Sequence, residues 1–253
     1  MDRFASFAGV GIAYAISGRG PDVLLLHGFG ADHQINWVGP GVVDALVAAG
    51  RRVIAYDARG HGQSDKPHDP RAYEGDAMKR DAVALLDHLG VEHVDVVGYS
   101  MGALVSTRLV PEEPRTRSCV LGGIGGRSRS GRALSPRARA AIADAMAVAN
   151  PTLVRPAARA FRSFADRTGA DRVALAAVVR SDTLGVRQRL DAINVPTMVI
   201  AGDRDVLAGS PQELAGQIPG AIARVVKGTH LGAVADPAFA TLITEFVTGV
   251  PVA

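Results

Sequence analysis

Short apolar runs alternate with longer segments of helical character along most of this 253-residue chain. The runs are rich in valine, isoleucine and leucine and end at glycine or polar residues, as buried strands do. Because a helix-length segment separates most of them, the pattern indicates parallel strands joined by right-handed crossovers. The expected strands are two within residues 3–16, which Gly9 separates, and then 22–26, 52–56, 91–97, 116–122, 195–201 and 221–226, with helices at 42–49, 76–89 and 101–110.

Residues 125–190 interrupt this alternation, because they contain no strand signal. Ser135-Pro136 is a typical helix start, and the residues up to 149 continue the helix. Two more helical stretches follow at 157–167 and 171–180. We therefore expect a single domain over 1–253, with a core formed by 1–124 and 191–253 and a helical lid formed by 125–190.

The segment Gly98-Tyr99-Ser100-Met101-Gly102 joins a predicted strand to a predicted helix. A tight strand-to-helix turn brings backbone against its central residue from two sides, which favours glycine on both flanks. A serine at such a turn projects its hydroxyl clear of the sheet, and the helix behind it directs free N–H groups toward the same point. The segment therefore predicts that Ser100 is a nucleophile beside a site for an oxyanion.

A serine hydroxyl is a poor nucleophile at neutral pH, so it needs a histidine base, which a carboxylate in turn orients. Both residue types follow later predicted strands. Asp203 and Asp205 lie in the loop after 195–201, and His230 lies in the loop after 221–226. Because the carboxyl ends of parallel strands meet at one edge of a sheet, we expect these groups close to Ser100. Either aspartate is a candidate for the acid.

Two further segments extend this series of strand-end loops. His27-Gly28-Phe29-Gly30 follows strand 22–26, and Asp57-Ala58-Arg59-Gly60-His61-Gly62-Gln63-Ser64 follows strand 52–56. With the Ser100 turn and the later loops in this order, the chain resembles the α/β-hydrolase family over nearly its full length. The resemblance implies the α/β-hydrolase fold, a mostly parallel eight-stranded sheet flanked by helices, with a helical lid insertion.

The resemblance also implies a role for each candidate residue. Ser100 attacks a carbonyl, His230 relays the proton, Asp205 orients His230, and the main-chain N–H groups of Phe29 and Met101 bind the oxyanion. The expected reaction is hydrolysis of a small-molecule carboxylic ester of small or medium acyl chain through an acyl-enzyme. In the family the acid lies three residues after the strand-end glycine, which favours Asp205; a shifted loop would instead give the role to Asp203.

The same serine constellation is found in other members of this family, namely C–C bond hydrolases, thioesterases, lactonases and perhydrolases. The sequence does not separate these activities from ester hydrolysis. Serine at position 100 argues against the relatives that use an aspartate nucleophile, the haloalkane dehalogenases and epoxide hydrolases. Some family members act as ligand receptors with little turnover, but here every catalytic position is filled, which favours an enzyme.

Other conspicuous residues are expected to be structural. We interpret His27 and His61 as groups that hydrogen-bond near their loops, and the resemblance gives Asp57 a structural role as well. Trp37 either lines the pocket entrance or packs beneath the first loop, and we favour packing. The single cysteine, Cys119, lies in an apolar run and has no partner for an internal disulfide, which fits a reducing compartment. With no convincing signal peptide and no apolar stretch long enough to cross a bilayer, we expect a cytoplasmic protein.

The positive charge of the chain is concentrated in residues 125–190. This segment holds 13 arginines, 4 aspartates and no lysine or glutamate, a local charge of +9 in a chain whose total is +3. The arginines are expected to cover solvated helix faces, although attraction of anionic substrates by the lid is an alternative, as is an adaptor that binds membranes or nucleic acid. Nucleic acid is not an expected partner, because Phe161 and Phe164 are the only aromatic residues in the segment.

The glycine-rich segment Gly122-Gly123-Ile124-Gly125-Gly126 follows a predicted strand, as phosphate-binding loops do. It has neither the dinucleotide-binding spacing nor the lysine of a P-loop, and the sequence has no cysteine–histidine cluster for a metal. We therefore expect no cofactor and no metal, and we interpret the segment as the loop that leads into the lid. The sequence does not indicate an oligomeric state.

Overall fold

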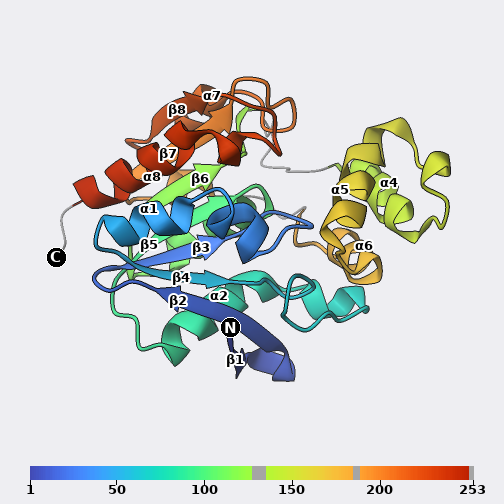
Figure 1. Cartoon of the computed structure of the whole chain (residues 1–253), viewed down its shortest axis with the longest axis horizontal. Coiled ribbons are helices and arrows are strands. Elements are labelled where there is room, and N and C mark those ends of the chain that lie inside the picture. Colours follow the sequence, from blue (N-terminus) through green and yellow to red (C-terminus); the bar gives the residue numbers. More distant parts are fainter. Residues whose placement is uncertain (127–134, 185–188, 251–253) are drawn as a thin grey trace.

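An eight-stranded sheet forms the centre of the protein in the computed structural model, which describes residues 1–126, 135–184 and 189–250. Its strands are β1 (Asp2–Ala5), β2 (Gly11–Ser17), β3 (Asp22–Leu26), β4 (Arg52–Tyr56), β5 (Val94–Tyr99), β6 (Thr116–Gly122), β7 (Thr197–Gly202) and β8 (Ile222–Val226). Their order across the sheet is β1-β2-β4-β3-β5-β6-β7-β8 (Figure 1). The pairs β1–β2 and β2–β4 are antiparallel, and the remaining pairs are parallel. The predicted mostly parallel, eight-stranded sheet is therefore confirmed.

Helices cover both faces of this sheet (Figure 1). α1 (Val42–Ala48) and α8 (Pro237–Gly249) pack on one face, and α2 (Ala77–His88), α3 (Met101–Leu109) and α7 (Pro211–Ala215) pack on the other. The split follows from the alternation of side chains along a strand: in β3, Val23 and Leu25 join the core under α1, whereas Leu24 and Leu26 join the opposite core. Among the described residues, no helix combines the length and apolarity needed to span a bilayer.

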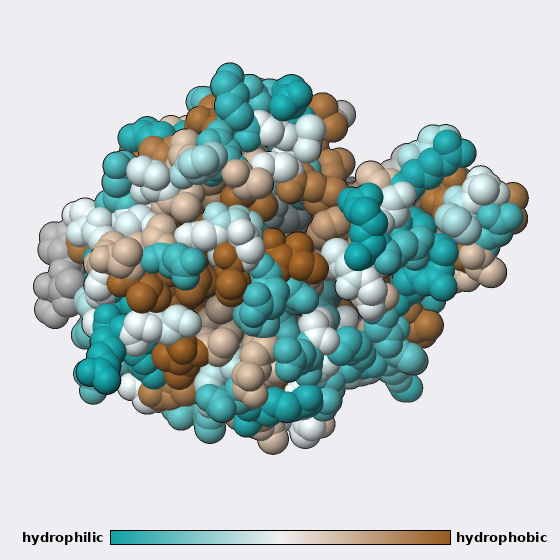
Figure 2. Space-filling view, viewed as in Figure 1, coloured by the Kyte–Doolittle hydropathy of each residue, from teal (hydrophilic) through white to brown (hydrophobic). Residues whose placement is uncertain are grey.

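The described residues between β6 and β7, here called the β6–β7 insertion, contain α4 (Pro136–Ala147), α5 (Arg159–Thr168) and α6 (Arg172–Arg180). Figure 1 shows these helices beyond one end of the sheet, and Figure 2 shows apolar side chains where the insertion meets the core. The Thr168 hydroxyl donates to the Gly30 carbonyl at 3.0 Å, and the Thr183 hydroxyl donates to the Tyr73 carbonyl at 2.7 Å. Side-chain hydrogen bonds thus join the insertion to two core loops.

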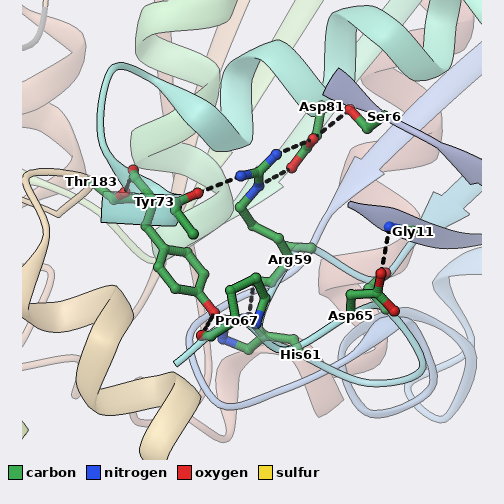
Figure 3. A network of polar contacts seen from close by, with 12 residues as sticks. Ser6, Gly11, Arg59, His61, Asp65, Pro67, Tyr73, Asp81 and Thr183 are labelled. Carbon is green, nitrogen blue, oxygen red and sulfur yellow. Dashed lines mark hydrogen bonds and ion pairs between the residues drawn. The ribbon is translucent and has the colours of Figure 1, made fainter. Parts of the chain in front are cut away.

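The loop between β4 and α2 is held by a buried ion pair (Figure 3). Arg59 donates through Nε and Nη2 to the two carboxylate oxygens of Asp81, at 2.5 and 2.7 Å, and both side chains are almost completely buried. The Ser6 hydroxyl donates to the same carboxylate at 2.6 Å, and Arg59 also donates to the Ala72 carbonyl. These bonds satisfy the polar groups of a buried pair, which would otherwise be costly to place in the interior.

The structure differs from the sequence prediction at some element boundaries. The strand expected at 91–97 runs from Val94 to Tyr99, because the Val91 N–H bonds to the Leu86 carbonyl and so belongs to the turn that ends α2. The prediction also omitted α7, α8 and a short π-helix, η2 (Gln34–Val38). Within the predicted lid, residues 127–134 and 185–188 lie outside the described residues, and the described part is helical without a strand.

Candidate active site

Ser100 occupies a tight turn between β5 and α3. Its backbone angles, φ 51° and ψ −109°, are rare for a residue with a side chain. The flanking glycines are required by space: a Cβ at Gly102 would lie 2.0 Å from the Leu26 carbonyl oxygen, and a Cβ at Gly98 would lie 2.5 Å from Ser106 Oγ. The Ser100 N–H donates to the Gly122 carbonyl at 2.8 Å, which ties the turn to β6.

Ser100, His230 and Asp205 form one hydrogen-bonded chain. Ser100 Oγ lies 2.9 Å from His230 Nε2, and His230 Nδ1 lies 2.8 Å from Asp205 Oδ2. Because a carboxylate can only accept, His230 Nδ1 donates to Asp205, and Nε2 is left to accept the Ser100 hydroxyl proton. This arrangement meets the geometric requirement for a serine nucleophile with an oriented base.

The two aspartates of the loop after β7 have different surroundings. The Asp205 side chain is fully buried, and its Oδ1 accepts from the N–H groups of Leu207 and Ala208 at 3.0 and 2.9 Å. Asp203 lies nearer the surface and accepts from the Gly228 N–H at 2.9 Å and from Lys227 Nζ at 3.1 Å. Asp203 therefore holds the loop that carries His230, and Asp205 contacts the imidazole itself.

The side chains of Asn36 and His27 fix the loop after β3 by hydrogen bonds. The Gly28 N–H donates to Asn36 Oδ1 at 2.8 Å. His27 Nε2 accepts from the Ala58 N–H at 2.9 Å, so the ring proton lies on Nδ1, which donates to the Gly28 carbonyl at 2.8 Å. Burial lowers the pKa of His27 and favours this neutral form. His27 therefore links the loop after β3 to the loop after β4 by hydrogen bonds.

Asp57 and His61 are also structural groups near the site. Burial alone would raise the pKa of Asp57, but hydrogen bonds from His33 and from the Gln63 N–H outweigh it and hold the pKa at about 2. Burial lowers the pKa of His61 to about 3, and its Nδ1 lies 3.1 Å from the Arg59 carbonyl oxygen. The imidazole of His61 is thus neutral at physiological pH.

Two largely apolar cavities meet at Ser100. The first has a volume of about 670 Å³ and the second about 740 Å³, and each is partly open to solvent. The first reaches toward η2 and the residues after His230, and the second reaches along α3 and under α4 and α6. The residues that line both cavities are Phe29, Ser100, Phe161, Leu207 and His230.

Some residues at the site were not predicted from the sequence. Asn36 lines the first cavity, and the Tyr99 hydroxyl donates to the His230 carbonyl. Phe161, noted in the sequence only as an aromatic residue, lines both cavities from the insertion. Trp37 is fully buried in the core under α1 and lines neither cavity, as expected, and Cys119 is buried as well. The described residues contain no cluster of three metal-binding side chains.

Comparisons with known proteins agree with this architecture. A family model described as the alpha/beta hydrolase fold matches residues 21–135. Epoxide hydrolase 3 of Siraitia grosvenorii is 38% identical over 103 residues, which are 39% of this chain and 30% of that protein. The chain spans about a third of the length of the curated relatives it matches.

Solved structures match over almost the whole chain. A hydrolase from Pseudomonas aeruginosa is 25% identical with a TM-score of 0.80, and the match covers 97% of each chain. The enol-lactonase of Burkholderia xenovorans is 26% identical with a TM-score of 0.74, covering 98% of this chain and 100% of that one. On the combined evidence of sheet order, family model and structural neighbours, the chain belongs to the α/β-hydrolase fold superfamily.

Proposed function

We propose that the protein is a serine hydrolase that cleaves carboxylic esters of small or medium acyl chain through an acyl-enzyme. The observation that carries the proposal is the hydrogen-bonded chain from Ser100 through His230 to Asp205, which lies where two apolar cavities meet. A neutral ester carbonyl fits such a site, because its flanking groups are apolar and its reacting atom needs a nucleophile and a base.

The proposed reaction begins with attack by Ser100 Oγ on the ester carbonyl carbon. His230 Nε2 takes the hydroxyl proton as the C–O bond forms, and Asp205 stabilises the imidazolium. Collapse of the tetrahedral intermediate breaks the bond to the alcohol, which leaves with the proton from His230. Water then attacks the acyl-enzyme with His230 again as base, and the acid departs from Ser100.

The N–H groups of Phe29 and Met101 are proposed to bind the oxyanion. Met101 opens α3, and the first N–H groups of a helix have no acceptor within it. Phe29 follows Gly28, whose N–H is held by Asn36, so the loop beside Ser100 is shaped by a side-chain bond. Donors of this kind stabilise the charge that develops in the transition state.

The β6–β7 insertion is proposed to act as the lid of the site in a single-domain protein. Phe161 of α5 lines both cavities, and Ile142 of α4 and Val179 of α6 line the second. These apolar side chains exclude water from the carbonyl once a substrate fills the cavities, which strengthens the electrostatic interactions around it.

Lactone hydrolysis is a second candidate. Two solved structures at 26% identity carry names of this activity, an enol-lactonase and an enzyme that degrades N-acyl homoserine lactones. A lactone is an internal ester, so the same three residues would open it by the same steps. Aspartate-nucleophile chemistry is disfavoured, because position 100 is serine.

The test is turnover of p-nitrophenyl esters from acetate to long chain, with simple lactones measured beside them, by the wild type and by Ser100→Ala. We expect turnover that disappears in Ser100→Ala, with the optimum at short or medium chains. Turnover of lactones alone would select the second candidate. A wild type no faster than Ser100→Ala on every substrate would overturn both candidates.

A further inference from the structure

The two polar atoms of the Asn36 side chain, Oδ1 and Nδ2, have different surroundings. Its Oδ1 accepts from the Gly28 N–H at 2.8 Å, and its Nδ2 is buried without a hydrogen-bond partner among the described residues. Because a main-chain N–H can only donate, the acceptor end of the amide must face Gly28, and this assigns the donor end. The residue is 4% exposed and lines the first cavity.

The nucleophile and this amide flank the same glycine. A Cβ placed on Gly28 would lie 3.4 Å from Asn36 Oδ1 and 3.5 Å from the Cβ of Ser100. The side chains of Asn36 and Ser100 therefore both lie against Gly28, and both residues line the first cavity. It comes from η2, a short π-helix that turns its side chain inward while Ile35 beside it is partly exposed.

The lining of the first cavity is otherwise apolar or already hydrogen-bonded. Of the side chains that line it in the described part of the chain, only Asn36, Tyr99, Ser100 and His230 carry polar atoms. Tyr99 donates to the His230 carbonyl, and Ser100 and His230 bond to each other. Among these polar groups Asn36 Nδ2 is the one without a hydrogen-bond partner, and its residue lines a cavity where a few placed polar groups decide how a ligand lies.

We propose that Asn36 Nδ2 donates a hydrogen bond to an oxygen of the substrate, so that the preferred substrates are esters with a second acceptor oxygen near the scissile carbonyl. The inference rests on the proposed function and names its substrate class. That oxygen is an ether, hydroxyl or carbonyl oxygen on the group held in the first cavity. An ester with only hydrocarbon there leaves the amide donor unpaired in an apolar site, which is unfavourable.

The experiment compares ester pairs that differ by one oxygen in place of a methylene. p-Nitrophenyl 3-methoxypropanoate against p-nitrophenyl pentanoate places the oxygen in the acyl part, and 2-methoxyethyl butanoate against butyl butanoate places it in the alcohol. Each kcat/KM ratio is divided by the ratio of the two hydroxide-catalysed rates, which removes intrinsic reactivity. The wild type, Asn36→Leu and the cavity control Ile35→Leu are measured.

We expect the wild type to prefer the oxygen-bearing ester in one of the two pairs by about tenfold or more, the usual effect of a buried unpaired donor. Asn36→Leu should lose this preference, whatever its overall rate, and Ile35→Leu should keep it. The pair that shows the effect tells which part of the ester lies in the first cavity. A wild type without preference in both pairs overturns the inference, even where Asn36→Leu does not fold.

Binding separates this inference from the proposed function. Calorimetry of the four esters with Ser100→Ala gives the same ratios as dissociation constants, without turnover. A wild type that hydrolyses no ester, with Ser100→Ala still binding the oxygen-bearing esters about tenfold more tightly, would retain the role of Asn36 and remove the hydrolase. Equal binding within each pair, or no binding, would overturn the role of Asn36.

Discussion

The Tyr99 hydroxyl donates its hydrogen bond to the main-chain carbonyl of His230. Tyr99 immediately precedes Ser100, so this bond connects the strand of the proposed nucleophile to the loop of its proposed base. The two rings also lie close together, with centroids 5.6 Å apart. Burial raises the pKa of Tyr99 above its ordinary value, so the hydroxyl stays a donor over the working pH range.

We predict that Tyr99→Phe lowers kcat roughly tenfold with little change in KM, because the loop of His230 loses a restraint and its Nε2 no longer stays aligned with Ser100. The free energy of unfolding should fall by about 1 kcal/mol, since a carbonyl loses its donor. The control is Tyr14→Phe, which removes a hydroxyl bonded to His88, and since neither residue lines a cavity at Ser100, it should leave kcat unchanged. Equal kcat values for Tyr99→Phe and wild type would contradict the prediction.

The backbone of Ser100 allows a test of stored strain. Its φ of 51° with ψ of −109° is a conformation that glycine adopts freely. Strain of this kind costs about 1–3 kcal/mol, against about 0.5–1 kcal/mol for the extra freedom of an unfolded glycine. Ser100→Gly should therefore be inactive yet more stable than Ser100→Ala by about 1 kcal/mol.

Urea unfolding of the two variants measures this difference. Ser106→Gly is the matched control, because it places glycine in the middle of α3 and should instead destabilise the protein by about 1 kcal/mol. Ser100→Ala should remain folded, since its hydroxyl contributes no packing to the core. A less stable Ser100→Gly would show that the turn is not strained.

The two aspartates after β7 should differ sharply in their effect on activity. Asp205→Asn replaces the acceptor of His230 Nδ1 with an amide and favours the wrong tautomer, so kcat should fall roughly 10⁴-fold. Asp203→Asn affects bonds to the Gly228 N–H and Lys227 and an ion pair with Arg204 near the surface, and its kcat should stay within about fivefold of wild type. Steady-state kinetics on one ester gives both kcat values. A larger loss of kcat in Asp203→Asn would mean that Asp203 is the acid that orients His230.

Acid sensitivity of the fold should arise partly from His61. The unfolded chain binds a proton on this residue below its ordinary pKa of 6.5, whereas the folded protein does so only near pH 3, because burial lowers the pKa. Between these values the unfolded state holds more protons, so stability falls as the pH falls, by about 1 kcal/mol per pH unit from this group.

Urea unfolding at steps from pH 7 to pH 4 measures that slope. His61→Phe keeps a buried aromatic ring without a titrating group, and we expect its stability to depend less steeply on pH than that of the wild type. His93→Gln alters an exposed histidine and should keep the wild-type slope. If the stability of His61→Phe and of wild type falls in parallel as the pH is lowered, another group causes the acid-dependent loss of stability.

Much of the architecture could be predicted because each signal was local. Valine-rich runs predicted the parallel strands, and glycines around Ser100 predicted a turn whose crowding is now visible at Leu26 and Ser106. Asp205 and His230 each directly follow a strand, and parallel strands bring such residues to one edge. The structure joins both to Ser100 in one hydrogen-bonded chain.

The features that the sequence did not predict depend on contacts between segments that are distant along the chain. Nothing in the run Gln34-Ile35-Asn36-Trp37 distinguishes Asn36 as a cavity residue, because its position depends on a π-helix and on the N–H of Gly28. The start of β5 was predicted too early, because Val91 is apolar and yet bonds to the end of α2. Periodicity reports which residues are apolar, and it does not report which of several partners an apolar residue will meet.

The two cavities that meet at Ser100 are lined partly by loops at the end of the sheet and partly by the β6–β7 insertion. The proposed nucleophile, its proposed base and the loop after β3 follow strands of the sheet, and at Gly98 and Gly102 beside Ser100 an added methyl group would collide with backbone. Phe161, Ile142 and Val179 come from the insertion instead, which is joined to the core at a few side-chain bonds. Under the proposed function the reacting groups and Asn36 belong to the core, whereas part of the apolar lining belongs to the insertion, so an exchange of residues 135–184 for the same region of a relative would change which apolar groups fit beside unchanged chemistry.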